Sequence, residues 1–181
     1  MLHSHRIVRA TPDDLPTIER IARATWPDTF ASILEPEQIE YMLQMMYRPE
    51  ALREQLEQGH VFHLLLGGQG QVANGYGGTT ERYRAVGYVS HQLDYLPDTT
   101  KIHKLYVLPN AQGKGYGRAL LETVERLAVR AGQKDLRLDV NYRNRAISFY
   151  EQQGFDKIER FDTEIGDGFL MEDWRMAKLL I

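Results

Sequence analysis

The sequence predicts an α/β fold in which a sheet of mixed strand direction has helices on both of its faces. Amphipathic helical segments alternate with strand-like segments along the 181 residues, and the charge is nearly balanced, with 22 basic and 25 acidic side chains. A chain of this length is typical of one domain with its own hydrophobic core. We therefore expect a single domain over residues 1–181, with the element order β-α-α-β-β-β-α-β-α-β-β.

The N-terminal part predicts one short strand followed by helices. Residues 7–9 have strand character. Thr11 then offers an N-cap and Pro12 a first helical residue, and apolar side chains recur at helical spacing behind them. A second helix is expected from Pro36 and a third, short one from residue 49 towards 59.

The rest of the chain alternates between strands and helices. Strands are expected at residues 61–66, 85–93, 102–108, 136–140, 155–165 and 169–179, and helices at 115–131 and 144–153. Six glycines between the first two of these strands predict a long flexible hairpin connection over residues 67–78. They are Gly67, Gly68, Gly70, Gly75, Gly77 and Gly78.

Composition excludes several classes of protein. Without cysteine, the chain has no disulfides, thiol nucleophile, cysteine-bound zinc or iron–sulfur cluster, and a cytoplasmic location is expected. No apolar run approaches the roughly 18 residues that a membrane helix needs, and the N-terminus lacks a signal-peptide core. The formal charge of −3 gives no reason to expect a nucleic-acid partner. We expect neither nucleic acid nor membrane as partner.

A glycine-rich turn between a predicted strand and a predicted helix has the features of an anion site. Backbone N–H groups are unpaired at the start of a helix, where the helix dipole is positive. Gly113, Gly115 and Gly117 would let a phosphate approach the backbone closely, and Lys114 and Arg118 add positive charge. A tight turn without a ligand is the alternative on these residues alone.

The spacing of the glycines limits which phosphate is expected. A Walker loop is absent, and a dinucleotide fingerprint fails because Arg118 or Leu120 stands where its third glycine should be. Asp139, about 22 residues beyond the last glycine, keeps a dehydrogenase as a rival. The spacing that fits is Gln112-x-x-Gly115-x-Gly117.

Two segments together resemble the GNAT superfamily of N-acetyltransferases. The first is the Gln112-x-x-Gly115-x-Gly117 turn, which is similar to the superfamily's pyrophosphate-binding signature. The second runs from Asn144 through Phe149-Tyr150 to Gly154-Phe155 and is similar to the superfamily's N-x-(x)-A-x-x-F-Y-x-x-x-G-F segment. Segments 26–30 and 166–169 resemble bacterial polyamine N-acetyltransferases.

The resemblance implies a fold, a co-substrate and site residues. The fold would have a mostly antiparallel sheet of about seven strands flanked by helices, and acetyl-CoA would be the co-substrate. The Leu105 N–H would hold the thioester oxygen, and the Tyr150 hydroxyl would protonate the departing sulfur. The residues implied to contact coenzyme A are Leu105, Tyr106, Val107, Gln112, Gly113, Lys114, Gly115, Tyr116, Gly117, Arg118, Ala119, Asn144 and Tyr150. Asn144 is also expected to cap its helix.

The general base is the open question. Related enzymes carry a glutamate four residues before the Leu105 position, where this chain has Lys101. Side chains alternate between the two faces of a strand, so His103 is expected on the same face as Lys101 and Leu105. Histidine can also titrate near neutral pH. His103 is therefore the first candidate. A water relay, or a carboxylate such as Glu172 or Asp173, is the alternative.

These observations predict an N-acetyltransferase that transfers acetyl directly to a small amine, with a polyamine as first choice. A peptide or protein N-terminal amine, or a non-catalytic acetyl-CoA-binding module, is the alternative, and the protein is expected to be a monomer or homodimer. The acceptor side is expected to be walled by Trp26, Phe30, Tyr41 and residues 42–46, and covered or opened by the 67–78 hairpin.

Other chemistries have weaker support in the sequence. No metal site is expected, because neither His3 with His5 nor His60 with His63 has carboxylates at ligand spacing. No serine lies in a nucleophile elbow, so a serine hydrolase is not expected.

Overall fold

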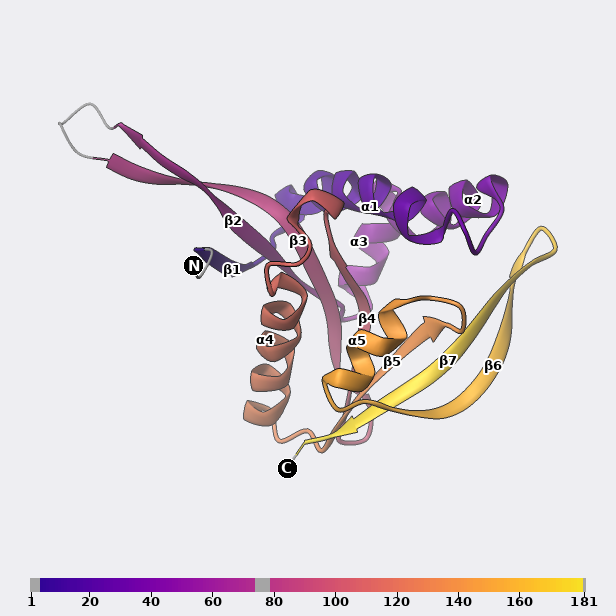
Figure 1. Cartoon of the computed structure of the whole chain (residues 1–181). Helices are drawn as coiled ribbons and strands as arrows, with labels where there is room; N and C mark the ends of the chain where they lie inside the picture. The colour runs from indigo at the N-terminus through magenta and orange to yellow at the C-terminus, as the bar shows by residue number, and fades with distance from the viewer. Residues whose placement is uncertain (1–3, 74–78, 181) are drawn as a thin grey trace.

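The computed structural model describes residues 4–73 and 79–180 (Figure 1). A seven-stranded sheet has the spatial order β1-β2-β3-β4-β5-β7-β6. The strands are β1 (His5–Arg9), β2 (Val61–Ala73), β3 (Thr79–Leu96), β4 (Thr99–Val107), β5 (Asp135–Asn141), β6 (Asp156–Gly166) and β7 (Phe169–Leu179). Among the described residues β4 and β5 form the one parallel pair, and every other pair is antiparallel. The predicted mixed sheet is confirmed.

The helices follow the predicted order as well. They are α1 (Leu15–Phe30), α2 (Pro36–Tyr47), α3 (Pro49–Glu57), α4 (Tyr116–Arg130) and α5 (Ala146–Gln152), with short 3₁₀ turns at Pro12–Asp14 and Pro109–Ala111. The predicted capping at Thr11 is present, because the Thr11 N–H donates to the Asp14 carboxylate over 2.8 Å. In the described part of the chain, no helix combines the length and the apolar character needed to cross a membrane.

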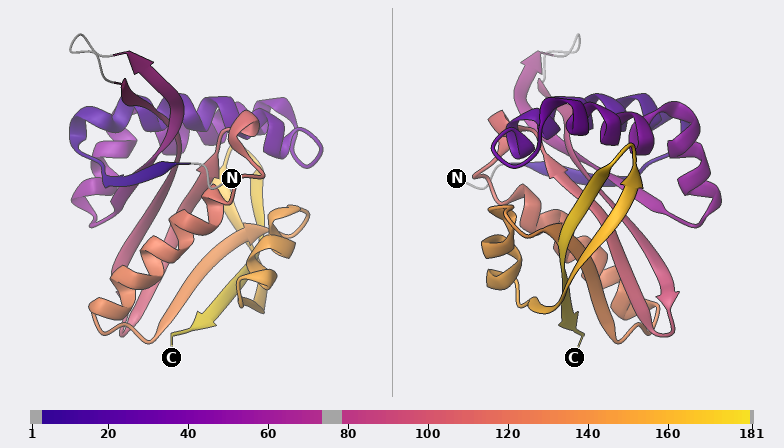
Figure 2. Two further views of the ribbon diagram at one scale, coloured as in Figure 1. Left: turned by 60° about the vertical axis from the view of Figure 1, so that its left-hand side comes forward. Right: turned by 90° about the vertical axis from the view of Figure 1, so that its right-hand side faces the viewer.

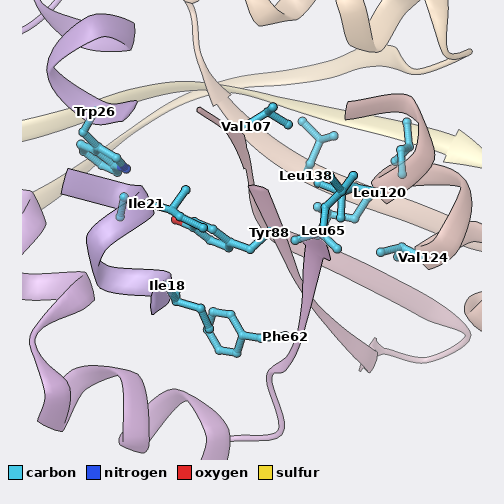
Figure 3. Packing of buried hydrophobic residues seen from close by; sticks show 14 of the residues in the cluster. Ile18, Ile21, Trp26, Phe62, Leu65, Tyr88, Val107, Leu120, Val124 and Leu138 are labelled. Atoms are coloured by element: carbon cyan, nitrogen blue, oxygen red, sulfur yellow. The ribbon is translucent and has the colours of Figure 1, made fainter. Parts of the chain in front are cut away.

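The helices cover both faces of the sheet (Figure 2). Ile18 and Trp26 of α1 pack towards Tyr88 on one face of β3, whereas Leu120 of α4 packs near Leu65 on the opposite face (Figure 3). All five of these side chains are almost fully buried. The core therefore lies in two layers, one on each side of the central strands, as the alternation of apolar residues predicts.

The glycine-rich segment is mostly part of the sheet, so the prediction of a long flexible connection was wrong for residues 67–73. β2 continues through Gly67, which pairs with Arg84, to Gln71, which pairs with Glu81. Gly70 has a φ of 92° at an irregularity in this ladder, where glycine is favoured. Cross-strand pairing overrides the low strand propensity of glycine here. Gly75, Gly77 and Gly78 lie outside the described residues.

β4 and β5 diverge after a short stretch of pairing. Their register runs only from Thr99 opposite Asp135 to Ile102 opposite Leu138. β4 then continues to Val107 and β5 to Asn141 without pairing to each other. The sheet therefore has a wedge-shaped opening between its two central strands.

A β-bulge precedes this opening on β4. Ser90 of β3 pairs with Lys104, but the next β3 residue, His91, pairs with Ile102, so His103 is an extra residue. His103 stacks on His60, whereas the Leu105 side chain faces Gly117 of α4 on the other side of the sheet. The expectation that His103 and Leu105 share a face was wrong, because the extra residue interrupts the period of two.

Candidate active site

A cleft of about 590 Å³ occupies the opening between β4 and β5. α1 and α2 form one wall of the cleft. The C-terminal halves of β4 and β5 and the N-terminal half of β7 form its floor, and the start of α4 together with α5 forms the other end. The cleft thus brings together the two sequence segments that carry the resemblance, the glycine turn and the Asn144–Tyr150 segment.

The glycine turn presents free backbone N–H groups to the cleft. Gly115 caps α4 with a φ of 79°, a left-handed conformation that favours glycine. The first helical hydrogen bond is donated by Ala119 to the Gly115 carbonyl, so the N–H groups of Tyr116, Gly117 and Arg118 remain available. A Cβ at Gly113 or Gly115 would have no neighbouring atom within 4 Å, so this concave turn has room for a phosphate.

The residues implied at this turn differ in whether they line the cleft and in which of their groups face it. Lys114 and Ala119 do not line the cleft, and the Ala119 N–H is already used within the helix. The Tyr116 ring lies against Gly67 of β2, so only its backbone faces the cleft. The Arg118 guanidinium pairs with Glu122 at 3.0 Å on the exposed surface. Geometry therefore favours main-chain recognition at this turn over recognition by lysine and arginine side chains.

The backbone of β4 faces the opening at alternate residues. The Leu108 N–H donates to Val86 of β3 over 2.8 Å, so alternation directs the N–H groups of Leu105 and Val107 away from β3 and into the opening. The Tyr106 backbone faces β3, and its ring packs between Trp26 and Tyr88. Of the three β4 residues implied to pair with coenzyme A, two offer their backbone and Tyr106 offers only its side chain.

Two further implied residues support the shape of the site through their side chains. Gln112 Nε2 donates to the Val107 carbonyl over 3.1 Å and so ties the turn to the end of β4. Asn144 Oδ1 accepts the Ala146 N–H over 2.8 Å, which confirms the predicted capping of α5. The neighbouring Arg145 also lines the cleft, although nothing beyond its place in the Asn144 segment pointed to it.

Tyr150 lies in the cleft with its side chain almost enclosed. The residue is 8% exposed, and no hydrogen bond of its hydroxyl is recorded within the described ranges. Burial raises the pKa of Tyr150 to about 12, because the phenolate would be poorly solvated. The phenol therefore stays protonated and is free to donate to a group bound in the cleft.

His103 is poorly suited to be the general base. Its Nε2 lies 3.1 Å from Gln92 Oε1, and its ring stacks on His60 at a centroid distance of 3.8 Å. Burial, together with nearby cationic and histidine side chains, lowers the pKa of His103 to about 2. Such an imidazole binds a proton too weakly to take one from an ammonium group near neutral pH.

The other residues at or near the expected position of the base differ in their ion pairs and in whether they line the cleft. Lys101 is buried and forms an ion pair with Asp139. Glu172 does not line the cleft and lies 3.7 Å from Arg160. Asp173 does line the cleft and is 5% exposed.

The acceptor wall differs in part from the expected one. Trp26, Phe30, Met42 and Met46 line the cleft, but Tyr41 does not. Instead, the Tyr41 hydroxyl donates to the Ile165 carbonyl over 2.6 Å.

This contact is one of a set that ties α2 to the β6–β7 hairpin. Gln38 Nε2 donates to the Leu170 carbonyl over 2.7 Å, and Tyr41 packs against Phe169. The hairpin tip approaches α2 (Figure 1). Sequence reasoning missed this latch, because the two segments are more than 120 positions apart. The residues between 67 and 71, expected to cover or open the cleft, do not line it.

The histidine pairs named from sequence do not come together as metal ligands. His60 stacks on His103, and His63 stacks on His91. His3 lies outside the described residues. In the ranges 4–73 and 79–180, no three histidine, aspartate or glutamate side chains are grouped to hold a metal ion.

Comparison with known proteins gives consistent matches along most of the chain. Residues 18–155 match the acetyltransferase (GNAT) family. A spermidine N(1)-acetyltransferase of Thermoplasma acidophilum is 29% identical over 172 residues, which cover 93% of this chain and 96% of that protein.

Solved structures agree with this match. The PaiA N-acetyltransferase of Thermoplasma acidophilum, in complex with coenzyme A, has a TM-score of 0.73 and 25% identity, covering 97% of this chain and 99% of that one. A GCN5-related N-acetyltransferase of Rhodopseudomonas palustris has a TM-score of 0.75 at 23% identity over 99% of both chains and so supports the fold. The chain therefore belongs to the GNAT acetyltransferase family and is an acetyl-CoA-dependent acetyltransferase.

Proposed function

We propose that this protein transfers the acetyl group of acetyl-CoA directly to a primary amine of a small polycationic acceptor, a polyamine, within a single domain. One observation carries the proposal. A single cleft joins an anion-binding helix start, outward-facing β4 backbone and a buried tyrosine to an acceptor end that contains the buried carboxylate of Asp173.

The donor end of the cleft suits coenzyme A. The free N–H groups at the start of α4 would hold its diphosphate. Its extended arm would pair with the outward-facing groups of Leu105 and Val107, as an added strand pairs with a sheet edge. The bound thioester supplies an activated acetyl group, and the Leu105 N–H would stabilise negative charge on its carbonyl oxygen.

Tyr150 is the proposed proton donor to the leaving sulfur. Its phenol is protonated, lacks a recorded partner and lines the cleft near α5. A thiolate that leaves without a proton is a poor leaving group, so a positioned acid contributes about 10²- to 10⁴-fold to the rate.

The surface beside the acceptor end favours a cation. Residues 35–41, at the start of α2, and 162–173, on the β6–β7 hairpin, include no lysine or arginine. Among their carboxylates, no ion pair is recorded for Glu35, Glu37, Glu164 or Asp167 in the described structure, and these four lie outside the lining of the cleft. Acidic groups near a cleft attract an acceptor that carries several ammonium groups. The similarity to a spermidine N(1)-acetyltransferase supports the same acceptor class.

A peptide N-terminus is less compatible with this mouth. Gln38 and Leu170 both line the cleft, and the hydrogen bond between them joins α2 to the β6–β7 hairpin, which would hinder a long chain that entered at this end. A short, linear polyamine needs no such passage.

The test is thiol release from acetyl-CoA in the presence of spermidine, spermine, putrescine, an aromatic monoamine and peptides with free N-termini. We expect release with the polyamines and little with the peptides. Faster turnover of peptides would reject the polyamine. Binding of acetyl-CoA without thiol release in any reaction would favour a non-catalytic module instead.

A further inference from the structure

A row of alternating charges crosses the sheet at the floor of the cleft, where Asp139 is one of the lining residues. Lys101 of β4 pairs with Asp139 of β5, and Asp139 also accepts from Arg175 Nε of β7 over 3.2 Å. Arg175 Nη1 in turn lies 2.6 Å from Glu159 Oε2 of β6. Each carboxylate in this row therefore has a cation beside it, so the cost of burying these charges is largely offset.

Asp173 lies one step further along the same face of β7, inside the cleft, and lacks such a cation. It is 5% exposed, yet the described structure records neither an ion pair nor a hydrogen bond for its carboxylate. Arg160 of β6 donates to the Asp173 carbonyl oxygen and not to its carboxylate. Its guanidinium instead contacts the carboxylates of Asp162 and Glu172.

A buried carboxylate without a partner is costly, so its position in a substrate cleft calls for a cation from outside the chain. Burial and the neighbouring Asp139 raise the pKa of Asp173 to about 6, against the opposing effects of Lys101 and Arg160. Asp162 adds a smaller effect in the raising direction. In the row of charges described above, each carboxylate is paired with a cation of the same chain, whereas the Asp173 carboxylate is not.

We propose that Asp173 receives the ammonium group of the acceptor and takes its proton, in the role that related enzymes give to the residue at the Lys101 position. This inference rests on the proposed acetyl transfer to an amine. Asp173 and Tyr150 line the same cleft, and both add to the effect of burial in raising the pKa of Tyr106, so both lie near that side chain.

The proton balance is complete with these two residues. The ammonium group gives one proton to Asp173, and the resulting amine forms the new C–N bond as the C–S bond breaks. Tyr150 gives its proton to the sulfur and takes back the second nitrogen proton from the forming amide. Asp173 then releases its proton to water, so one proton is released for each amide and thiol formed.

The groups that face Asp173 come from every element around the cleft. β5 contributes Asp139, β6 contributes Arg160 and Asp162, and α5 contributes Tyr150. β4 contributes Lys101, His103, Lys104 and Tyr106, and the turn before α5 contributes Arg145, whereas the cleft-facing residues of α1 and the middle of α2 are uncharged. No permanent cation among them contacts the Asp173 carboxylate in the described structure.

The experiment compares Asp173→Asn with a matched control, Asp135→Asn. Asp135 lies on β5, pairs with Arg137 at 3.2 Å and does not line the cleft. With spermidine as the probe, we expect Asp173→Asn to lower kcat/KM by about 100-fold or more, and the control to change it by less than about threefold. Acetyl-CoA binding, measured by calorimetry, should stay the same in both variants, which also shows that they fold.

The pH profile separates a chemical role from a structural one. Wild-type kcat/KM should fall below a pKa of about 6 as Asp173 becomes protonated, and this acid limb should be absent from Asp173→Asn. The defect should also shrink at alkaline pH, where the amine loses its proton without help. Asp173→Glu should recover part of the rate.

Two outcomes of these experiments distinguish a failure of the role proposed for Asp173 from a failure of the proposed function. If the wild type turns over but Asp173→Asn keeps both its rate and its acid limb, the role of Asp173 is rejected and the acetyltransferase proposal stands. If the wild type turns over no amine in the panel, the proposed function itself fails.

Discussion

Acid should destabilise this protein through its buried histidines, of which His91 gives the sharpest test. His91 is 2% exposed on β3 and stacks on His63. Burial, with smaller effects of His63 and Arg9, lowers the pKa of His91 to about 4 in the folded state. An unfolded histidine titrates at about 6.5.

The sign follows from which state binds the proton more readily. Below about pH 6.5 the unfolded chain gains a proton at His91 that the folded protein excludes, so stability is complete above that pH and falls as the pH drops towards 4. At pH 5 the difference between the two pKa values corresponds to about 2 kcal/mol for this residue. His60, with a pKa near 4, and His103, with a pKa near 2, are partly exposed. We therefore assign each of them a loss of stability at pH 5 of about 1 kcal/mol, half of the value for His91. The total of about 4 kcal/mol is a large part of the stability of an ordinary domain.

Urea denaturation between pH 5 and pH 8 measures this effect in the wild type and in His91→Gln. The variant should lose about 2 kcal/mol less than the wild type over this range, whatever its stability at pH 8. Ser90→Ala, at the neighbouring buried residue, removes no titratable group, so it is the control and should keep the pH dependence of the wild type. Equal pH dependence in wild type and His91→Gln would refute the reasoning.

Three further substitutions test the site. Tyr150→Phe should lower kcat by about 100-fold with acetyl-CoA affinity unchanged, and stopped-flow thiol detection showing near-normal turnover would remove the tyrosine from the mechanism. Gly115→Ala forces an alanine to a φ of 79°, at a cost of about 1–2 kcal/mol, and should raise the KM for acetyl-CoA about tenfold. Gly132→Ala, with a φ of 75° at the far end of α4, should lower thermal stability but leave that KM unchanged. Tyr41→Phe removes the hydrogen bond to Ile165 and should raise the KM for the amine but not for acetyl-CoA, and the reverse pattern would contradict the latch.

Local patterns were sufficient for most of the fold and for the donor end of the site. Helical spacing and capping located α1 and α4 within a few residues, and Gly113 and Gly115 do adopt the left-handed conformations that the turn requires. These features depend on neighbours within a few positions, so a single sequence contains the information.

Features that depend on distant strands could not be read in the same way. The extra residue at His103 is defined only by its register against β3, and no residue type marks it. Asp173 was one candidate among several, because its isolation depends on the order β5-β7-β6, in which strands far apart in the chain become neighbours. The segment from Gly67 to Gln71 was misjudged because a partner strand decides whether glycines are ordered.

The single additional residue in β4 can be removed without changing which residues of β3 and β4 pair. Deleting His103 would leave the pairs Ser90–Lys104 and His91–Ile102 in direct succession, and Leu105 would keep its partner Val89. Deleting a residue after the bulge, such as Leu105 itself, would instead move the following residues by one position against β3 and exchange their faces. The backbone that meets the acetyl donor therefore depends on the number of residues between Lys104 and Val107, and much less on the length of β4 before them.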